Sequence, residues 1–117
     1  MPTRYEYPDA LAIVVPASTT GSSTTAPVSI GGFSYAGLVL PAVFNSTQVL
    51  VKVGPTSTAV YDAYTDAGAQ YVAKIGTSRF VALDTPLIQV AEFVSFVFSA
   101  STSGEAAQRT VQLMLKG

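Results

Sequence analysis

Short apolar runs separated by turn-forming residues recur along the whole chain and limit the folds open to it. Each run is only a few residues long, is rich in Val, Phe, Tyr and Ile, and is bounded by Gly, Pro, Asn, Ser or Thr. β-Branched and aromatic residues favour extended backbone, and Gly and Pro interrupt it. The pattern predicts an all-β chain with strands at Leu11–Val15, Val28–Ile30, Tyr35–Leu40, Val49–Val53, Val60–Tyr64, Tyr71–Ile75, Phe80–Leu83, Phe93–Ser99 and Thr110–Leu115.

The alternation of side chains within these runs indicates how the strands are covered. Val49–Val53 and Thr110–Leu115 alternate apolar with more polar residues, which is typical of a strand with one face on the core. Phe93–Ser99 is apolar on one face and largely apolar on the other, so we expect cover on both sides. Together with the regular spacing of turns, this predicts one domain over residues 1–117, an antiparallel β-sandwich of about eight strands with its core in 28–117.

Helical content is expected to be small. No stretch keeps apolar residues at helical spacing for three turns without Gly or Pro. Two short helical turns are predicted, at Pro41–Ser46 and at Pro86–Ala91, because proline at the first position supplies the backbone angle that a helix needs. The pair Gly31-Gly32 predicts a turn.

Charged side chains are scarce, and this bears on the partners of the protein. The 42 residues between Asp9 and Lys52 contain none, and the whole chain has 11% charged residues, whereas about a quarter is usual for a soluble domain. We interpret this as a surface intended for neighbouring subunits. Net charge is −1 and the six basic residues are scattered, so we expect no nucleic-acid partner.

Several classes of chemistry lack their usual residues. The chain has no His and no Cys, which removes the commonest general base and the soft metal ligands. Asp62 and Asp66 are the best carboxylate pair, but EF-hand spacing is absent and a hairpin explains them: Asp66 opens a turn and Gly68 accepts positive φ. We therefore expect no catalytic residue, no metal and no cofactor, and a protein that is not an enzyme.

Prolines at positions 16, 27 and 41 interrupt every candidate membrane helix. We accordingly expect no membrane partner. The first residues carry Glu6 and Asp9 near Arg4, without the basic leader and long apolar stretch of a secretory signal, so we interpret them as mature sequence.

The region 1–27 is treated as an N-terminal segment followed by a Ser/Thr-rich arm. The tract Ala17–Ala26 is almost entirely Ser, Thr and Gly, and its composition fits either a mobile loop or an arm that pairs with a neighbouring subunit. Two tyrosines flank Glu6 outside the clear strands and are predicted to contact a partner. The predicted contact residues are Arg4, Tyr5, Tyr7, Thr19, Thr20, Thr24, Thr25, Tyr64 and Asp66.

An ordered series of sequence blocks runs from Leu40 to Leu115. The blocks are Leu40-Pro41-Ala42 with Phe44, Val49–Val53, Tyr61-Asp62-Ala63-Tyr64, Asp66-Ala67-Gly68-Ala69, Arg79–Asp84, Phe93–Ser99 and Ala107–Leu115 with Arg109-Thr110-Val111. This series resembles small structural proteins of tailed bacteriophages, of the kind that decorate or cement the capsid. Phe44 stands where relatives often place Trp, and the Ser/Thr arm has no counterpart in the resemblance.

This resemblance implies a jelly-roll or related sandwich, no cofactor, and a virion protein on the capsid surface. The expected function is to cement adjacent subunits of the major capsid protein, as a homo-oligomer such as a dimer or trimer. A neck, tail or fibre subunit is the alternative. A carbohydrate-binding module that stacks sugars on Tyr61, Tyr64 or Tyr71 is a third hypothesis, weakened by the absence of Trp.

Overall fold

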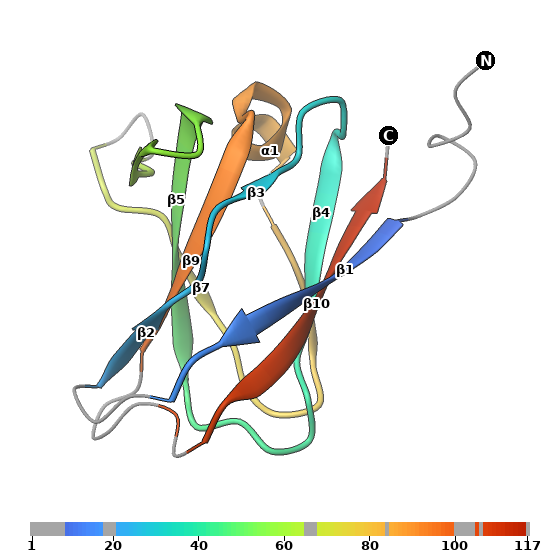
Figure 1. Cartoon of the computed structure of the whole chain (residues 1–117), viewed down its shortest axis with the longest axis vertical. Coiled ribbons are helices and arrows are strands. Elements are labelled where there is room, and N and C mark those ends of the chain that lie inside the picture. Colours follow the sequence, from blue (N-terminus) through green and yellow to red (C-terminus); the bar gives the residue numbers. More distant parts are fainter. Residues whose placement is uncertain are drawn as a thin grey trace.

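Two antiparallel sheets pack face to face in the computed structural model of the chain, which describes residues 9–17, 21–64, 68–83, 85–99, 105 and 107–116. Sheet A has the strand order β1-β10-β4-β8, and sheet B has the order β2-β9-β5-β6, with β3 paired to β9 and β7 paired to β5 (Figure 1). The elements are β1 (Asp9–Val15), β2 (Ser22–Thr24), β3 (Val28–Ser29), β4 (Tyr35–Val39), β5 (Gln48–Thr56), β6 (Ala59–Asp62), β7 (Val72–Lys74), β8 (Phe80–Ala82), α1 (Thr85–Val90), β9 (Phe93–Ser99) and β10 (Arg109–Lys116).

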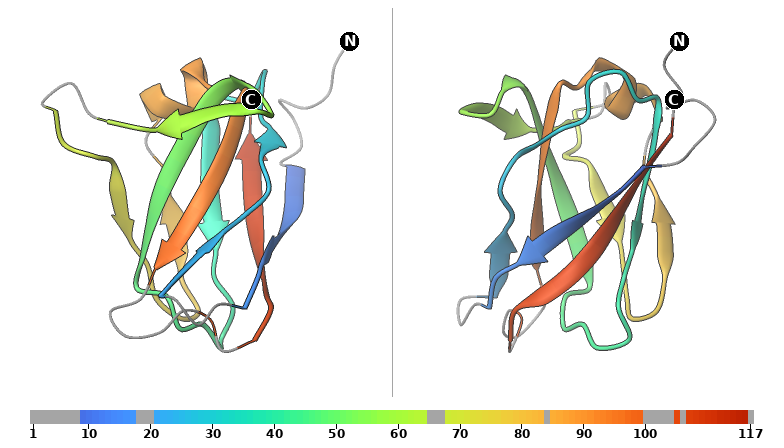
Figure 2. Two further views of the ribbon diagram at one scale, coloured as in Figure 1. Left: turned by 60° about the vertical axis from the view of Figure 1, so that its left-hand side comes forward. Right: turned by 45° about the vertical axis from the view of Figure 1, so that its right-hand side comes forward.

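The predicted all-β sandwich is confirmed, and each of the nine predicted runs overlaps one strand of the structure. Two further views show the sheets as two layers with α1 at one end (Figure 2). The predicted helical turn at Pro86–Ala91 corresponds to α1. The turn predicted at Gly31-Gly32 is present, with Gly32 at φ 92°, and Gly68 has φ 89° in the predicted hairpin.

The core lies between the two sheets and depends on their central strands. On β9, Val94, Phe96 and Phe98 point inward and are at most 1% exposed. Phe98 meets the ring of Phe44 edge-on, with ring centroids 5.4 Å apart, a favoured geometry for aromatic pairs. The expected alternation in β10 is present as well, because Leu113 is fully buried while its neighbours do not reach the core.

The opposite face of β9 is covered only in part, which is less than its sequence predicts: Ser95 is buried beneath Thr25, whereas Phe93, Val97 and Ser99 are half-buried. The Ser95 hydroxyl donates to the Thr25 carbonyl at 2.6 Å, and the Phe96 N–H donates to the Thr25 hydroxyl at 3.0 Å. A buried hydroxyl without a partner costs free energy. The first bond gives the hydroxyl of Ser95, which is 1% exposed, a partner inside a largely apolar strand. The second satisfies the backbone N–H of the next residue.

The Ser/Thr tract differs from the expectation. Where the structure describes it, the tract is neither a loop nor an arm: Ser22–Thr24 is β2, antiparallel to β9 with Ser23 opposite Phe98. The Ser23 hydroxyl donates to the Pro16 carbonyl at 2.7 Å. The two buried hydroxyl side chains of the tract fit here because Ser23 and Thr25 each have a backbone partner, so composition alone was a misleading guide. Residues 18–20 lie outside the described part.

The predicted helical turn at Pro41–Ser46 is wrong, and a distant carboxylate explains why. Glu105 is 1% exposed and accepts hydrogen bonds from the N–H of Asn45 at 2.9 Å, from the N–H of Ser46 at 2.7 Å and from the Ser46 hydroxyl at 2.6 Å. Arg109 Nε donates to the same carboxylate at 3.1 Å. Glu105 thus binds backbone N–H groups that in a helix would donate to the carbonyls of the same segment, and the segment is an irregular loop.

Burial alone would raise the pKa of the Glu105 carboxyl group. The hydrogen bonds from the Ser46 hydroxyl, the Asn45 and Ser46 N–H groups and Arg109 outweigh that effect and lower the pKa below its ordinary value of 4.5. A carboxyl group whose pKa is lower in the folded chain than in the unfolded chain stabilises the fold above the ordinary value. This stabilisation is lost as the pH falls through the lower folded value.

We predict that Glu105→Gln lowers the free energy of unfolding by about 2 kcal/mol at neutral pH, because an amide nitrogen cannot accept these charge-assisted bonds. The difference from wild type should shrink as the pH falls below 4.5, the ordinary pKa of this carboxyl group, and on through the lower pKa of the folded chain. Urea titrations at a series of pH values measure both effects. Asp62→Asn is the matched control, since Asp62 is exposed and its oxygen lies 3.9 Å from Lys52 Nζ, and it should change stability by less than about 0.5 kcal/mol. A constant difference across the pH series would contradict the prediction.

We predict that Phe98→Ala lowers the free energy of unfolding by about 3–5 kcal/mol, because it removes a fully buried ring and leaves a cavity. Phe80→Ala is the control: Phe80 is 64% exposed, so its loss should cost less than about 1 kcal/mol. Denaturant unfolding of the two variants compares them directly. Equal losses would show that Phe98 does not hold the core.

Candidate interaction surface

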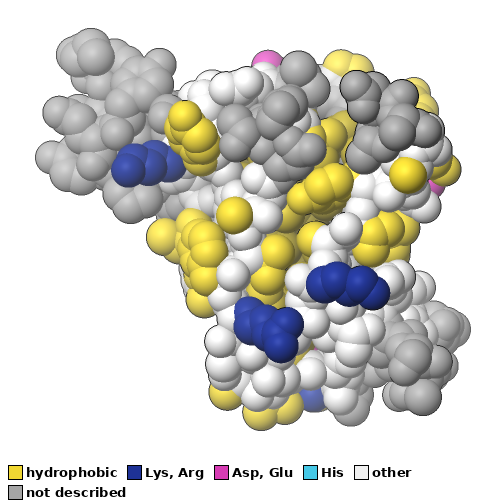
Figure 3. Space-filling model, turned by 180° about the vertical axis from the view of Figure 1, so that it is seen from behind, with side chains coloured by type: hydrophobic (Ala, Val, Ile, Leu, Met, Phe, Trp, Pro, Cys, Tyr) yellow, Lys and Arg dark blue, Asp and Glu magenta, His cyan; other side chains and the backbone are white. Residues whose placement is uncertain are grey.

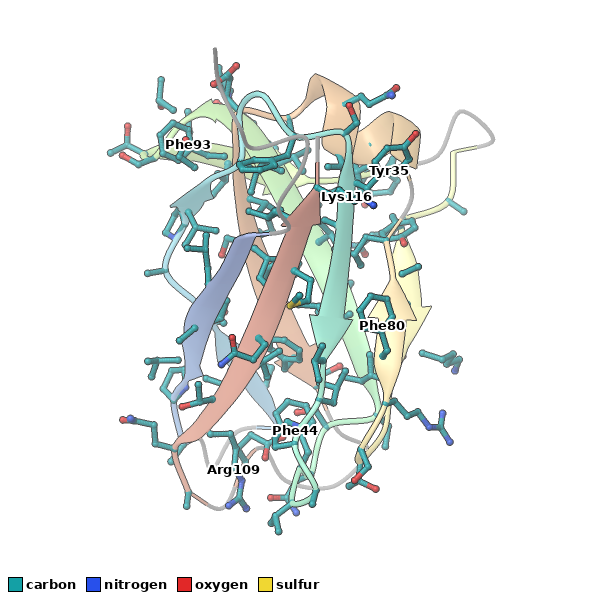
Figure 4. The ribbon with its side chains drawn as sticks, turned by 90° about the vertical axis from the view of Figure 1, so that its right-hand side faces the viewer. Tyr35, Phe44, Phe80, Phe93, Arg109 and Lys116 are labelled. Atoms are coloured by element: carbon teal, nitrogen blue, oxygen red, sulfur yellow. The ribbon has the colours of Figure 1, made fainter. Side chains whose placement is uncertain are left out.

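The outer face of sheet A exposes apolar side chains where a sheet facing water normally carries polar ones. Strand alternation places Val14 of β1, Val39 of β4 and Phe80 of β8 away from the core, and they are 50%, 37% and 64% exposed. Tyr35, at the start of β4, is 53% exposed. Figure 4 looks onto this sheet and shows Tyr35 and Lys116 together near one end, with Phe80 on the neighbouring edge strand. A face of this kind is typical of a binding surface.

A groove of about 400 Å³ lies in this face, over β4, β8 and the end of β10. Its position depends on Gly37: a Cβ atom there would come within 2.6 Å of the Phe80 Cζ, so the ring of Phe80 lies against the bare backbone of β4. The pairing of Gly37 with Ala82 on one side and Met114 on the other brings three strands to this point. The lining residues are Tyr35, Ala36, Gly37, Phe80, Ala82, Leu83, Met114, Leu115 and Lys116.

Lys116 is the one charged residue among those nine lining residues. It is exposed, and it lies opposite Tyr35 in the pairing of β10 with β4. Apolar walls with a single cation at the rim favour a ligand that is mostly apolar or aromatic and carries a negative charge at one point.

Charge elsewhere on the described surface is dispersed. Seen from behind, hydrophobic side chains run down the middle of the molecule, and Lys and Arg side chains lie at separate points beside them (Figure 3). The pair Lys52 and Asp62, 3.9 Å apart and partly exposed, adds little stability because water screens it. No part of this view has the concentrated positive charge that binding to phosphates requires.

Two further site types receive no support from the described residues. Within the described ranges no group of three or more His, Cys, Asp or Glu residues is arranged to hold a metal ion. The buried carboxylate of Glu105 accepts hydrogen bonds from Asn45, Ser46 and Arg109, so its role is structural. As for membranes, no helix in the described part of the chain is both long and apolar enough to span one.

The structure separates the predicted contact residues that it describes. Thr24 is exposed on β2, and Tyr64, which bridges to Gln70, is 61% exposed. Thr25 is 4% exposed and bonded to β9, so its side chain is not on the surface and the prediction for this residue needs correction. Those outside the described residues are Arg4, Tyr5, Tyr7, Thr19, Thr20 and Asp66.

Of the three tyrosines considered as sugar platforms, Tyr61 and Tyr64 are exposed, at 66% and 61%, whereas Tyr71 packs against the core. Among the other described aromatic residues, Tyr35 and Phe80 are exposed as well, whereas Phe33, Phe44, Phe96 and Phe98 are buried.

Sequence reasoning missed the groove. A usable signal was present in the alternation of β10, where Met114 occupies an outward position between two buried leucines. Gly37 in the middle of β4 was a second signal, because glycine inside a strand often marks close approach of another group. Neither signal reveals that β8 pairs with β4 and brings Phe80 over Gly37, because this pairing depends on the tertiary structure.

The comparisons with known proteins bear on the fold alone. Neither a protein-family model nor a curated protein matches this sequence. Among solved structures, the crystal structure of the SPBc2 prophage-derived protein YomS is similar, with a TM-score of 0.52 and 13% sequence identity over 93% of this chain and 94% of that one. The chain thus shares its fold over nearly its full length with a protein derived from a prophage.

Proposed function

We propose that the protein is a structural subunit of a tailed-phage particle that binds the outer surface of the capsid and cements adjacent subunits of the major capsid protein. The observation that carries this proposal is the outer face of sheet A, which exposes Val14, Tyr35, Val39 and Phe80 and contains an apolar groove. In water such a face favours association, at roughly 25 cal/mol for each Å² of apolar surface buried.

Two independent facts support a phage particle as the setting. The fold is shared with a prophage-derived protein, and the order of sequence blocks from Leu40 to Leu115 resembles small virion structural proteins. The scarcity of charge between Asp9 and Lys52 is consistent with a surface that is covered in an assembly, since a free domain relies on charge for solubility.

The size of sheet A bears on how the subunit binds. Four strands about 4.8 Å apart and about 20 Å long present a face of roughly 400 Å², whereas a stable interface buries about 800 Å² on each partner. One sheet face thus provides about half of a standard interface. Self-association as a dimer or trimer would make up for the small area, because several weak contacts with the capsid lattice would then act together.

Binding to the capsid should depend on sheet A. We predict that Phe80→Asp prevents the protein from binding capsids that lack it, because a carboxylate would be buried against apolar walls. Tyr61→Asp is the matched control, since Tyr61 is a similarly exposed aromatic, 66% against 64%, on a strand of sheet B. Co-sedimentation of each variant with purified capsids measures binding, and urea unfolding verifies that both variants are folded. Equal capsid binding by the two variants would show that sheet A is not the surface that contacts the capsid.

Cementing itself predicts a change in the stability of the shell. Capsids that carry the protein should rupture at a higher temperature than capsids without it, and dye access to the packaged DNA during heating measures this. Identical rupture temperatures would contradict a cement. Copy number per virion provides the second readout: many copies over the shell agree with the proposal, while a few copies at one vertex would assign the protein to the neck or tail.

A further inference from the structure

β1 forms one edge of sheet A and is the least protected edge strand of the two sheets (Figure 2). It is seven residues long, and Ala10–Val15 contains no charged residue, no Gly and no Pro. An open edge of this kind invites another strand to pair with it. We propose that β1 pairs antiparallel with β1 of a second copy of this protein, so that two copies of sheet A join into one continuous sheet. The inference rests on the proposed function, for which it names the contact between subunits.

The other edges have the features that usually prevent such pairing. β2 and β3 are three and two residues long, and Pro27 stands between them. β6 ends at Asp62 and has an irregular register with β5, and β7 ends at Lys74. β8 has only three residues. Ala10–Val15 has none of these features, so β1 is the edge at which a further strand is favoured.

The hydrogen bonds of sheet A determine which backbone groups of β1 face the open edge. The Leu40 N–H donates to the Arg79 carbonyl at 2.7 Å. The Leu83 N–H donates to the Ala36 carbonyl at 2.9 Å. The even-numbered residues of β4 therefore bond to β8. Because successive residues of an antiparallel strand bond to opposite sides, the odd-numbered residues of β4 bond to β10.

The same alternation continues across β10 to β1. The β10 residues opposite the odd-numbered residues of β4 have even numbers, from Gln112 to Lys116, so these bond to β4. The odd-numbered residues of β10 then bond to β1, where they lie opposite odd-numbered residues. This leaves the N–H and C=O groups of Ala10, Ala12 and Val14 facing the open edge. In the described part of the chain no backbone hydrogen bond outside the pairing of β1 with β10 involves them.

These three residues are complementary to the same residues of a second copy. A two-fold axis beside Ala12, perpendicular to the sheet, places Ala12 opposite Ala12 of the other copy and Ala10 opposite Val14. In this register each of the three residues exchanges both of its hydrogen bonds with its partner. A shift by two residues would bring Pro16, which has no N–H group, opposite Ala10, or would take Val14 past the start of β1. The register centred on Ala12 is therefore the favoured one.

The side chains of β1 are compatible with this pairing. Ala12 is exposed on the outer face, and its small side chain lets two copies approach at the axis. On the inner face Leu11 is 37% exposed and would lie opposite Ile13 of the second copy, where apolar cross-strand pairs stabilise a sheet. The one charged residue of β1, Asp9, would lie opposite Val15. Like charges therefore do not oppose each other across the pair.

The pairing also enlarges the surface that sheet A offers to a capsid. A two-fold axis perpendicular to the joined sheet leaves the outer faces of both copies pointing in the same direction. Each face covers roughly 400 Å², so two of them approach the roughly 800 Å² that a stable interface buries on one partner. The dimer thus presents the area that one subunit lacks.

Charges placed at the two-fold axis test the pairing in the full-length protein. Ala12→Lys and Ala12→Glu should each weaken self-association at least about tenfold, because the Cα atoms of the two copies of Ala12 lie only about 5.5 Å apart in the pair. Sedimentation velocity over a range of concentrations, in about 0.1 M salt, measures self-association.

Gln112→Lys and Gln112→Glu are the matched controls. Gln112 is exposed on the same face, opposite Ala12 in the pairing of β1 with β10. In the dimer it lies three strand spacings, about 14 Å, from its own copy, which is beyond the distance at which this salt concentration screens exposed charges. These variants should change self-association by less than about twofold.

The decisive measurement mixes Ala12→Lys with Ala12→Glu. Because residue 12 of one copy meets residue 12 of the other, the mixture should associate at a concentration at which neither variant does so alone. A contact between two different surfaces of the protein does not bring residue 12 beside itself and would not give this result. If the mixture stays dissociated, or if the wild-type protein is monomeric at all concentrations, the proposal is overturned.

A disulfide measures the register without added charge. The chain has no Cys, so Ala12→Cys introduces a single thiol, and a Cα separation of about 5.5 Å lies within the range that a disulfide bridges. Oxidation with diamide should convert Ala12→Cys to a covalent dimer, whereas Gln112→Cys should remain monomeric because its copies are too far apart. Urea unfolding verifies that every variant is folded. Equal yields of covalent dimer from the two variants would overturn the pairing.

The capsid experiments remain separate from this test. Association of the charge-complementary mixture together with unchanged capsid rupture temperatures would retain the dimer and reject the cement. Capsid binding by a wild-type protein that is monomeric at all concentrations would retain the capsid contact and overturn the dimer. Loss of that binding in Ala12→Lys would then assign the edge of β1 to a strand of the capsid protein.

Discussion

Burial of the inward face of β9 is the constraint on which the rest of the fold depends. Its inward residues Phe96 and Phe98 fill the space between the sheets, and its other face holds the buried Ser95. The buried hydroxyl of Ser95 requires a partner. Thr25 provides that partner and, with β2 and β3, the cover along one edge of β9. The Ser/Thr tract is therefore part of what makes sheet B possible.

The elements that could be predicted are those that are specified by their own residues. Val49–Val53, Phe93–Ser99 and Thr110–Leu115 have side-chain alternation that specifies strands whatever lies around them, and Pro86 begins a helical turn as expected. Elements that depend on distant partners were not predictable. Pro41–Ser46 has the composition of a helical turn, but Glu105, about sixty residues away in sequence, binds its backbone donors. β2 forms because β9 offers it an edge.

The candidate site, too, could be predicted only as far as local sequence patterns indicate it. Scarce charge indicated a surface that meets neighbours, and the alternation of β10 put Met114 on the outside, but neither defines a binding site. The groove arises where β8 joins β4 and sets Phe80 against Gly37. This depends on which strands are neighbours, and strand order is not encoded in local pattern. The predicted partner contact at Thr25 was wrong because the polar composition of its tract suggests an exposed side chain. Hydrogen bonding to β9 buries that side chain instead.

The strand order of sheet A also has a consequence for biosynthesis. β10 lies between β1 and β4, so the first strand of the described chain has no partner in its sheet until the last one has been made. Sheet A therefore cannot close before β10 has left the ribosome, and the apolar residues of β1 lack their β10 partner until then. Formation of the sandwich is a late, nearly all-or-none event governed by contacts of long sequence separation, which is the kind of topology that folds slowly. Chaperone occupancy of the nascent chain should accordingly persist until β10 has left the exit tunnel.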